Sequence, residues 1–391
     1  PSLEITDAGG NGVEGIEVSA ELNGGSFSEE SAVQVSTGSS GIAEFDNLVI
    51  TGAAAGYTIT FTTASSSIAD VTSDPFDVTS AAADPVNSSA NVPNGSAGDQ
   101  TDISISLQDE FENPVEGAAG RITAEVSSGP NSGASFAEII DAGDGAYQTS
   151  YTPSATGTDE ITIELNGTAI DGSPFISEVV ATDAENIDVT GQPQDAVAGE
   201  VIGGSPAVIV TDGLGNTIGD VEVTVSVDGN AGISSGTTIK TTNSSGTAVF
   251  DDLVIQESGS FRLRFDALGV SEGAVSNQFT IRPAAANDLI RVSGNGQSAA
   301  VNEVLDNPFV VRVVDAFGNP VQGESVDFTN SDTPDGASGT GLSTENAVTN
   351  SSGNASATLT LGSATGDYTV NAGSGVGTVQ FTAEAIAGDA V

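Results

Sequence analysis

Apolar and polar residues alternate in short runs along the whole chain. The clearest run is Ile103, Ile105 and Leu107, which alternate with Ser104 and Ser106. Successive side chains of a β-strand point to opposite faces, so a period of two predicts a strand with one buried and one wet face. Similar runs occupy residues 3–6, 16–20, 208–210, 221–225 and 309–313. The pattern predicts an all-β fold.

One turn-like sequence recurs between such runs. DAFGNPVQG at 315–323 places an Asp, a Gly-Asn pair, a Pro and a closing Gly between two apolar segments, which is typical of a turn joining strands. The frame returns at 7–15, 109–117 and 212–220, about every hundred residues. We expect each Asp to cap its own turn rather than to bind a ligand. The turn residues are Asp7, Asn11, Asp109, Asn113, Asp212, Asn216, Asp315 and Asn319.

The repeat divides the chain into domains. Its 391 residues suit four domains of about 100 residues each. Boundary sequences rich in Ala recur at 81, 181 and 284, and they predict repeat 1 (1–80), repeat 2 (81–181), repeat 3 (182–283) and repeat 4 (284–385). Repeat 1 carries six residues before its Asp where the others carry roughly 25, so we expect it to lack its opening strand. Residues 386–391 are predicted to begin the first strand of a following domain.

The charge balance changes which partners can be considered. There are 54 acidic residues against 7 basic ones, a formal net charge of −47, and the excess extends over all four repeats. Such a surface excludes nucleic acid and anionic lipid as natural partners. Its self-repulsion is screened near 1 M salt, where the Debye length falls to about 3 Å. The sequence therefore predicts a protein adapted to high salt. The chain has no run of about 18 apolar residues, so we expect no membrane span and no membrane contact by this segment.

The residue types present exclude most catalytic chemistry. The chain has no His and no Cys, which removes His-based triads, thiol nucleophiles, disulfides and zinc sites of the usual kind. The carboxylates offer many chance pairs, but no pair is distinguished by its sequence context. Lys240 is the only lysine, and a Ser–Lys arrangement around it is disfavoured. We expect no enzyme activity and no cofactor.

Calcium is the one metal that the sequence leaves open, because it prefers hard oxygen ligands. Acidic residues stand at every predicted boundary, where a cation would stiffen the junction, but diffuse screening by bulk cations is the favoured alternative. The calcium candidates are Asp74, Asp84, Asp183, Glu185 and Asp288. The Asn-x-Ser/Thr sequon marks candidate glycosylation sites at Asn87, Asn94, Asn166, Asn243, Asn350 and Asn354, although chance occurrence is the favoured alternative.

Two stretches resemble known families. In repeat 4, DAFGNPVQG followed by a strand and by NSSGNASATLTLGSATGDYTV at 350–370 resembles the group 1 bacterial immunoglobulin-like domain of invasin and intimin. In repeat 2, GDGAYQTSYTPSATG at 143–157 and GSPF at 172–175 resemble the filamin repeat. The resemblance implies four tandem immunoglobulin-like β-sandwich domains in an elongated array. Its motifs are architectural, and they transfer no catalytic or receptor-binding residue.

The favoured function is a structural segment of an extracellular, adhesin-like stalk or fibre on the surface of a prokaryote adapted to high salt. Its partners would be further copies or further domains of the same protein, with host-cell or surface glycans bound by regions outside this chain. One alternative is a subunit of a surface filament joined by strand complementation, in which Ile386 and Val391 would complete repeat 1 of the next copy. A second alternative is a carbohydrate-binding or enzyme-accessory module, which the absence of Trp disfavours.

Overall fold

The computed structural model describes residues 1–229 and 232–388, and nearly all of its regular structure is β-strand. One 3-10 turn, η1 (Ala119–Arg121), is the only helical element in these two ranges. The all-β prediction is therefore confirmed. The chain separates into two compact units, Pro1–Thr182 and Asp183–Val391, and each holds two of the predicted repeats. Among the described residues, no helix is long and apolar enough to cross a membrane.

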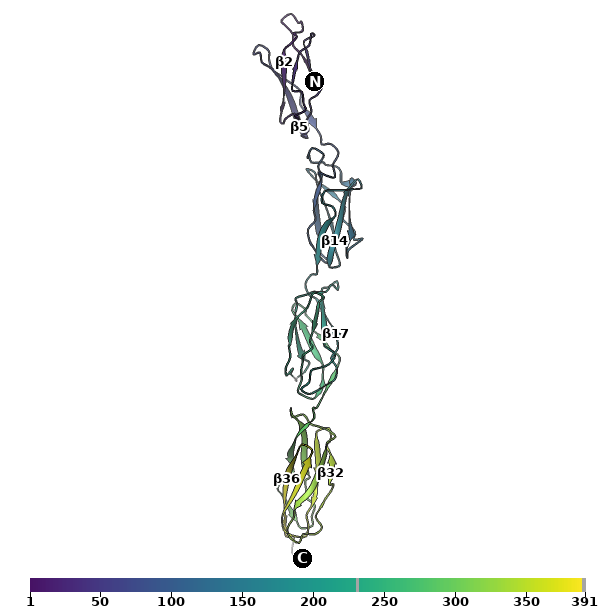
Figure 1. Ribbon diagram of the computed structural model, residues 1–391, viewed down its shortest axis with the longest axis vertical. Coiled ribbons are helices and arrows are strands. Elements are labelled where there is room, and N and C mark those ends of the chain that lie inside the picture. The colour runs from purple at the N-terminus through teal and green to yellow at the C-terminus, as the bar shows by residue number, and fades with distance from the viewer. Residues whose placement is uncertain (230–231, 389–391) are drawn as a thin grey trace. The chain divides into compact units, whose positions relative to one another are not determined.

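Repeat 1 is built from two small antiparallel sheets in the first unit. Strands β2 and β5, labelled in Figure 1, form its centre, and the sheet runs in the order β3-β2-β5-β6 with β7 also paired to β5. The second sheet consists of β1 and β4. The strand bounds are β1 (Ser2–Glu4), β2 (Glu17–Asn23), β3 (Gln34–Ser36), β4 (Ile42–Glu44), β5 (Ala54–Thr63), β6 (Val71–Thr72) and β7 (Phe76–Val78).

Repeat 2 completes the first unit with a four-stranded and a five-stranded sheet. Their orders are β12-β13-β10-β8 and β11-β14-β16-β9, with β15 paired to β14. Strand β9 runs parallel to the last strand, β16. The bounds are β8 (Ser89–Asn91), β9 (Gly95–Ser96), β10 (Thr101–Ser106), β11 (Ile122–Ser128), β12 (Ile140–Gly143), β13 (Ala146–Tyr151), β14 (Gly157–Leu165), β15 (Thr168–Ala169) and β16 (Phe175–Val180).

Repeat 3 opens the second unit. Its sheets are β17-β19-β22, β18-β26-β23 and β21-β20-β24-β25, and β18 runs parallel to the last strand, β26. The bounds are β17 (Asn186–Gly191), β18 (Ala196–Val197), β19 (Ala207–Thr211), β20 (Glu222–Val227), β21 (Ile239–Thr241), β22 (Thr247–Val249), β23 (Gly259–Phe261), β24 (Leu263–Ala267), β25 (Ala274–Val275) and β26 (Phe279–Arg282).

Repeat 4 completes the second unit. Its sheets are β27-β29-β33, β28-β36-β35-β30-β32 and β31-β34, and β28 runs parallel to β36. The bounds are β27 (Ala286–Ser293), β28 (Gln297–Ala300), β29 (Phe309–Asp315), β30 (Ser325–Asp332), β31 (Gly341–Leu342), β32 (Asn346–Val348), β33 (Asn354–Ala357), β34 (Leu359–Thr360), β35 (Gly366–Ser374) and β36 (Gly377–Ile386).

Each repeat has its own apolar core, formed by the inward-facing positions of its alternating strands. In β10, Ile103 and Ile105 are 1% and 2% exposed, as the period of two predicts. Aromatic pairs fill the centres of the other repeats; for example, the ring centroids of Phe309 and Phe381 lie 4.7 Å apart. The buried apolar side chains form four separate clusters, one in each repeat. This is expected when the sheets of each repeat pack against one another around a core of their own.

Candidate functional site: the aspartate–asparagine loops

The recurring loop of repeat 2 is closed by its own aspartate. Oδ1 of Asp109 accepts hydrogen bonds from the backbone N–H groups of Phe111 and Asn113, both at 2.9 Å. The side-chain amide of Asn113 donates to Oδ2 of Asp109, also at 2.9 Å. A short carboxylate reaches the backbone two and four residues ahead only when the chain turns back, so Asp at this position favours a turn.

The other three loops repeat this arrangement. In each, Oδ1 of the Asp accepts the N–H groups two and four residues ahead, and the Asn side chain bonds the same carboxylate. The backbone bonds to Oδ1 are those from Gly9 and Asn11 to Asp7 (2.9 and 2.9 Å), from Leu214 and Asn216 to Asp212 (2.9 and 2.8 Å), and from Phe317 and Asn319 to Asp315 (2.9 and 2.8 Å).

The carboxylates differ in burial, and their pKa values reflect their hydrogen bonds. Asp109, Asp212 and Asp315 are 0%, 0% and 2% exposed, whereas Asp7 is exposed. Burial pushes the pKa of Asp109 and Asp315 upward, but the bonds from the loop asparagine, the linker and the loop backbone outweigh it, so both pKa values are lowered. The pKa of Asp7 is also lowered, chiefly by the backbone N–H of Asn11. All three carboxyl groups therefore favour the charged form.

The buried carboxylates also hold the segments that connect neighbouring repeats. Oδ2 of Asp109 accepts the backbone N–H of Ala81 at 2.8 Å, and Oδ2 of Asp315 accepts that of Ala284 at 2.9 Å. Both alanines stand at the predicted start of a repeat. Each Asp thus fixes the point at which the chain enters its own repeat.

The loop asparagines of repeats 2 and 4 bond the preceding repeat in the same way. Nδ2 of Asn113 donates to the backbone oxygen of Thr51 at 2.7 Å, and its Oδ1 accepts the N–H of Ala53 at 2.8 Å. A primary amide offers one donor and one acceptor side by side, so it pairs with the C=O of one residue and the N–H two residues later, as a neighbouring strand would. We call this pair of bonds the asparagine clasp.

The second clasp has matching distances. Nδ2 of Asn319 donates to the backbone oxygen of Gln256 at 2.7 Å, and Oδ1 of Asn319 accepts the N–H of Ser258 at 2.8 Å. Residues 256–258 follow the segment FDDLVI in repeat 3, just as residues 51–53 follow FDNLVI in repeat 1. The same position of two different repeats is therefore held by the same side chain of the next repeat.

An aromatic ring supports the clasp between repeats 3 and 4. Phe317, two residues after Asp315, lies so close to Gly199 that a side chain at residue 199 would overlap the ring. Gly199 also has a φ of 84°, a conformation that favours glycine. Repeat 4 therefore contacts repeat 3 through a ring packed against bare backbone as well as through hydrogen bonds.

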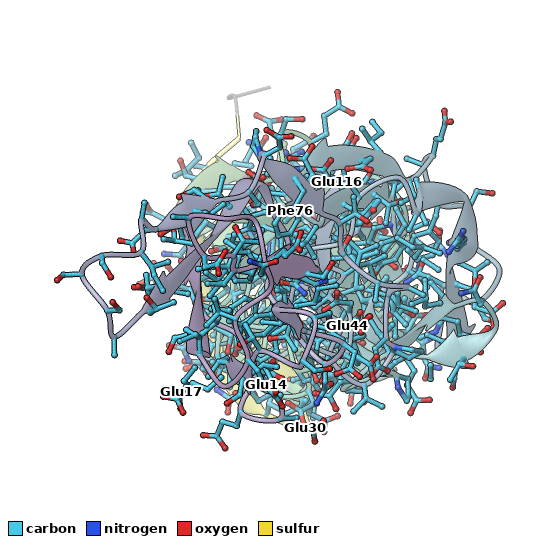
Figure 2. The ribbon with its side chains drawn as sticks, turned by 90° about the horizontal axis from the view of Figure 1, so that it is seen from above. Glu14, Glu17, Glu30, Glu44, Phe76 and Glu116 are labelled. Carbon is cyan, nitrogen blue, oxygen red and sulfur yellow. The ribbon has the colours of Figure 1, made fainter. Side chains whose placement is uncertain are left out.

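The rest of the surface is acidic, with few ion pairs. The exposed side chains of Glu14, Glu17 and Glu30 point outward from the ribbon in Figure 2. Within the described residues, the ion pairs are Lys240–Asp251, Arg264–Asp266 and Arg282–Asp195, all in repeat 3. Exposed pairs of this kind contribute about 0–1 kcal/mol each. With 54 acidic and 7 basic residues, most of the carboxylates have no basic partner, so water and dissolved cations must screen their charge.

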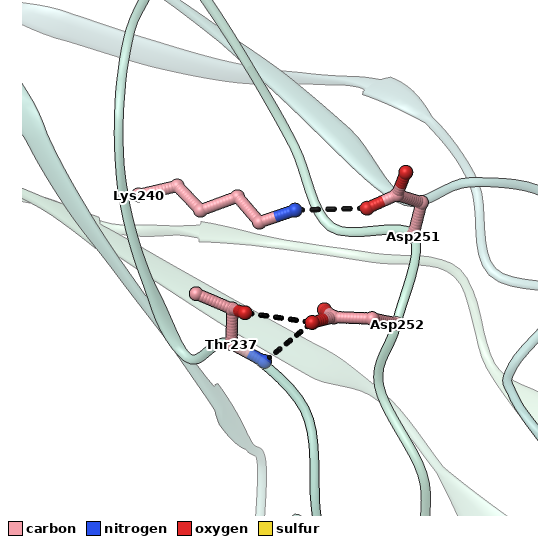
Figure 3. Close-up of polar contacts among 4 residues, drawn as sticks. All are labelled: Thr237, Lys240, Asp251 and Asp252. Atoms are coloured by element: carbon pink, nitrogen blue, oxygen red, sulfur yellow. Dashed lines mark hydrogen bonds and ion pairs between the residues drawn. The ribbon is translucent and has the colours of Figure 1, made fainter.

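The side chain of Lys240 forms an ion pair within repeat 3. Its Nζ lies 2.8 Å from Oδ1 of Asp251, and beside this pair Asp252 accepts two hydrogen bonds from Thr237 (Figure 3). The hydrogen bond from Lys240 lowers the pKa of Asp251, and the side-chain bond from Thr237 is the largest cause that lowers the pKa of Asp252. These contacts join strand β21 and the residues just before it to the segment at Asp251 and Asp252, and no serine takes part in them.

The five calcium candidates are not brought together. Among the described residues, no group of three or more acidic side chains could hold a metal ion. Asp84 uses Oδ1 to accept the N–H of Val86, and Asp288 uses Oδ1 to accept the N–H of Leu289. Asp74, Asp183 and Glu185 are exposed and lie in loops.

The sequon asparagines differ in accessibility. Asn94, Asn166, Asn243 and Asn350 are exposed, whereas Asn87 and Asn354 are partly buried. The side chain of Asn87 donates to the backbone oxygen of Asp109 at 2.9 Å, and Asn354 accepts a bond from Arg312 at the same distance. Asn87 and Asn354 are therefore the less accessible of the six candidates.

The tail residue Ile386 does not begin a new strand. It is the last residue of β36 and pairs with Ala300 of β28, so it belongs to the sheet of repeat 4. The parallel partner strand extends β36 one residue beyond the predicted boundary at 385. Val391 lies outside the described residues.

The residues that receive the clasps were not predicted from the sequence. These residues contribute only backbone atoms to the clasps, so no shared side-chain type marks Thr51, Ala53, Gln256 and Ser258. The sequence did offer a signal of position. Both segments lie between an apolar run that recurs in the two repeats and an aromatic residue, Tyr57 in repeat 1 and Phe261 in repeat 3.

Comparison with known proteins gives one family match. Residues 82–176 match the family model of the Filamin/ABP280 repeat, as the resemblance of repeat 2 predicts. No curated protein is significantly similar in sequence to the chain.

Several solved structures are similar to the chain. The Escherichia coli adhesin FdeC is 21% identical, and the match covers 78% of this chain and 99% of that one with a TM-score of 0.45. Invasin, described as a bacterial integrin-binding protein, is 15% identical over 98% of this chain and 75% of that one, with a TM-score of 0.44. The Lin-41 filamin domain is 24% identical over 25% of this chain and 97% of that one, with a TM-score of 0.23.

Proposed function

We propose that the chain is a structural segment of an extracellular, adhesin-like stalk or fibre of a prokaryote that lives at high salt. The observation that carries the proposal is the asparagine clasp, which joins repeat 2 to repeat 1 and repeat 4 to repeat 3 with the same two hydrogen bonds. Contacts of this kind between neighbouring repeats add to the stability of the individual repeats in a chain of repeated domains, and a stalk needs such contacts.

The chemistry of the clasp suits such a medium. An amide side chain carries no charge, so its bonds are not screened by salt as an exposed ion pair would be. The acidic surface, with a net charge of −47, gains from the same screening because repulsion between carboxylates falls. High salt would therefore stabilise the domains without weakening the joints between them.

The partners that follow from this role are further domains or further copies of the same protein. Binding to a host cell or to surface glycans would be the task of regions outside this chain.

Two measurements test the proposal. Small-angle scattering of the chain in 2 M salt should give the profile of four beads in a rod, and a compact globule of four contacting domains would contradict a stalk. Brief protease treatment of intact cells of the source organism should release peptides of this protein. Release only after cell lysis would contradict an extracellular location.

A further inference from the structure

The segments that receive the two asparagine clasps carry different side chains. Repeat 1 offers Thr51 and Ala53, whereas repeat 3 offers Gln256 and Ser258 at the same two positions. In both clasps the bond that the asparagine donates is 2.7 Å long and the bond that it accepts is 2.8 Å long. The geometry of the clasp is therefore the same although the receiving side chains differ.

The residue between the two bonded positions differs even more. It is Gly52 in repeat 1 and Glu257 in repeat 3, and both residues are exposed. Gln256, whose backbone oxygen accepts the clasp bond, is exposed as well. A receiving segment thus tolerates a glycine or a charged residue at its centre, because its backbone makes the contact and the side chain is open to solvent.

The loops that make the clasps are built alike. The residue before the asparagine has a positive φ, 67° at Glu112 and 86° at Gly318. Proline follows the asparagine in both loops, and its ring fixes the backbone at the next position. The loop aspartate holds the amide nitrogen of the asparagine at 2.9 Å in repeat 2 and at 2.8 Å in repeat 4. The loop alone therefore sets the direction of the clasping amide.

The second contact between repeats 3 and 4 also meets backbone. The ring of Phe317 packs against Gly199, which has no side chain. Hydrogen bonds to the main chain give affinity for an extended segment, whereas pockets for its side chains give specificity. The clasp and the ring have the first property without the second.

We propose that the asparagine clasp is a connector that accepts any repeat of this kind, whatever the side chains of its receiving segment. The partner is a repeat that presents a backbone oxygen and, two residues later, a backbone N–H directly after a run such as FDNLVI at 45–50 or FDDLVI at 250–255. This role rests on the stalk proposed above and adds which repeats can be neighbours in it. Exchange or addition of repeats would leave such joints intact.

An exchange of receiving side chains in the complete chain tests the proposal. Thr51→Gln with Ala53→Ser gives repeat 1 the receiving residues of repeat 3 and keeps every backbone atom of the clasp. Asn113→Ala is the control that removes the clasp from the same joint. A third chain combines the exchange with Asn113→Ala.

The readout is hydrogen exchange of the N–H of residue 53, which donates to Oδ1 of Asn113. Protection is expressed as the ratio of the rate in an unfolded peptide to the observed rate, which corrects for the changed side chain. We expect the exchanged chain to keep the protection of the natural chain. Asn113→Ala should lower it about five-fold, alone or combined with the exchange, because one hydrogen bond of about 1 kcal/mol is lost.

The reciprocal exchange repeats the test in the second unit. Gln256→Thr with Ser258→Ala is read at the N–H of residue 258 and compared with Asn319→Ala. A separate joint keeps the test decisive even where one exchanged chain fails to fold.

Two results would overturn the proposal. If an exchanged chain loses as much protection as Asn113→Ala or Asn319→Ala does, the clasp depends on the receiving side chains. The stalk would then be unaffected, because the natural chain keeps its clasps and its scattering profile is measured separately. If the two alanine variants keep full protection, the clasp does not form in solution, and the observation that carries the proposed function falls with the connector.

Discussion

Nδ2 of Asn319 donates a 2.7 Å hydrogen bond to the backbone oxygen of Gln256, which lies 63 residues earlier in the sequence and in the preceding repeat. The same nitrogen lies 2.8 Å from Oδ2 of Asp315, which in turn bonds the linker residue Ala284. One aspartate–asparagine pair thus connects the loop of repeat 4, the linker and the end of repeat 3. The residues that close a local turn therefore also connect two domains.

The first prediction concerns the freedom of movement at this joint. Asn319→Ala removes both clasp bonds, so the distribution of distances between spin labels in repeats 3 and 4 should broaden. The chain has no cysteine, so labels on Thr224→Cys and Ser356→Cys, both at exposed positions, would be unique. Loss of two hydrogen bonds whose partners reach water would cost about 1 kcal/mol.

Asn11→Ala is the matched control for that experiment. Within the described residues, the side chain of Asn11 bonds only Asp7 of its own loop. This change removes the same loop contacts without touching a joint, so it should leave the label distances between repeats 3 and 4 unchanged. An equally narrow distribution in Asn319→Ala would show that the clasp does not restrain the repeats.

The second prediction concerns acid. The pKa of Asp315 is lowered in the folded chain, because its hydrogen bonds outweigh the opposing effect of burial. A lowered pKa stabilises the fold above the unfolded value of about 3.9, and this stabilisation is lost as the pH falls through the folded pKa. Protonation of the many other carboxylates relieves repulsion and acts in the opposite direction.

The effect of Asp315 is therefore isolated by comparing two chains. Asp315→Asn cannot titrate, so its stability should fall less steeply than that of the natural chain as the pH is lowered from about 4 to about 2. Local hydrogen exchange in residues 315–321 measures the difference. Parallel pH profiles for the two chains would contradict the lowered pKa.

The sequence contained enough information to predict the strands and the turns but not the joints. The alternation at Ile103 and Ile105 and the turn chemistry of Asp109 are local properties, and local geometry decides them. A clasp needs a side chain from one repeat and bare backbone from another, and backbone atoms leave no residue type to recognise. Thr51 and Gln256 perform the same task with unrelated side chains. The boundary at 385 was wrong by one residue because pairing of Ile386 depends on β28, far away in the sequence.

The third prediction tests the contact between Phe317 and Gly199. Gly199→Ala should destabilise repeat 3 for two reasons, since alanine is disfavoured at a φ of 84° and its Cβ would overlap the ring. In the double variant with Phe317→Ala the overlap disappears, and only the backbone cost of about 1 kcal/mol remains. Unfolding of the three variant chains and the natural chain in urea completes the cycle. Purely additive costs would show that the ring does not press on residue 199.

The fourth prediction concerns salt. Repulsion among exposed carboxylates opposes folding, and it is screened as the Debye length falls from about 10 Å at 0.1 M to about 3 Å at 1 M. The midpoint of thermal unfolding should therefore rise by several degrees between 0.1 and 2 M, with NaCl and KCl alike. The same midpoint at both concentrations of both salts would contradict adaptation to a saline medium.

Substitution of exposed glutamates by glutamine tests whether their charges cause the salt dependence of stability. A chain with Glu14→Gln, Glu17→Gln, Glu30→Gln and Glu44→Gln loses four exposed negative charges from repeat 1 (Figure 2). Its repeat 1 should be more stable at 0.1 M and should gain less from added salt, because less repulsion remains to be screened. Addition of 1 mM CaCl₂ separates screening from specific binding: a rise as large as that produced by 2 M NaCl would require a calcium site, since so dilute a salt barely changes the Debye length.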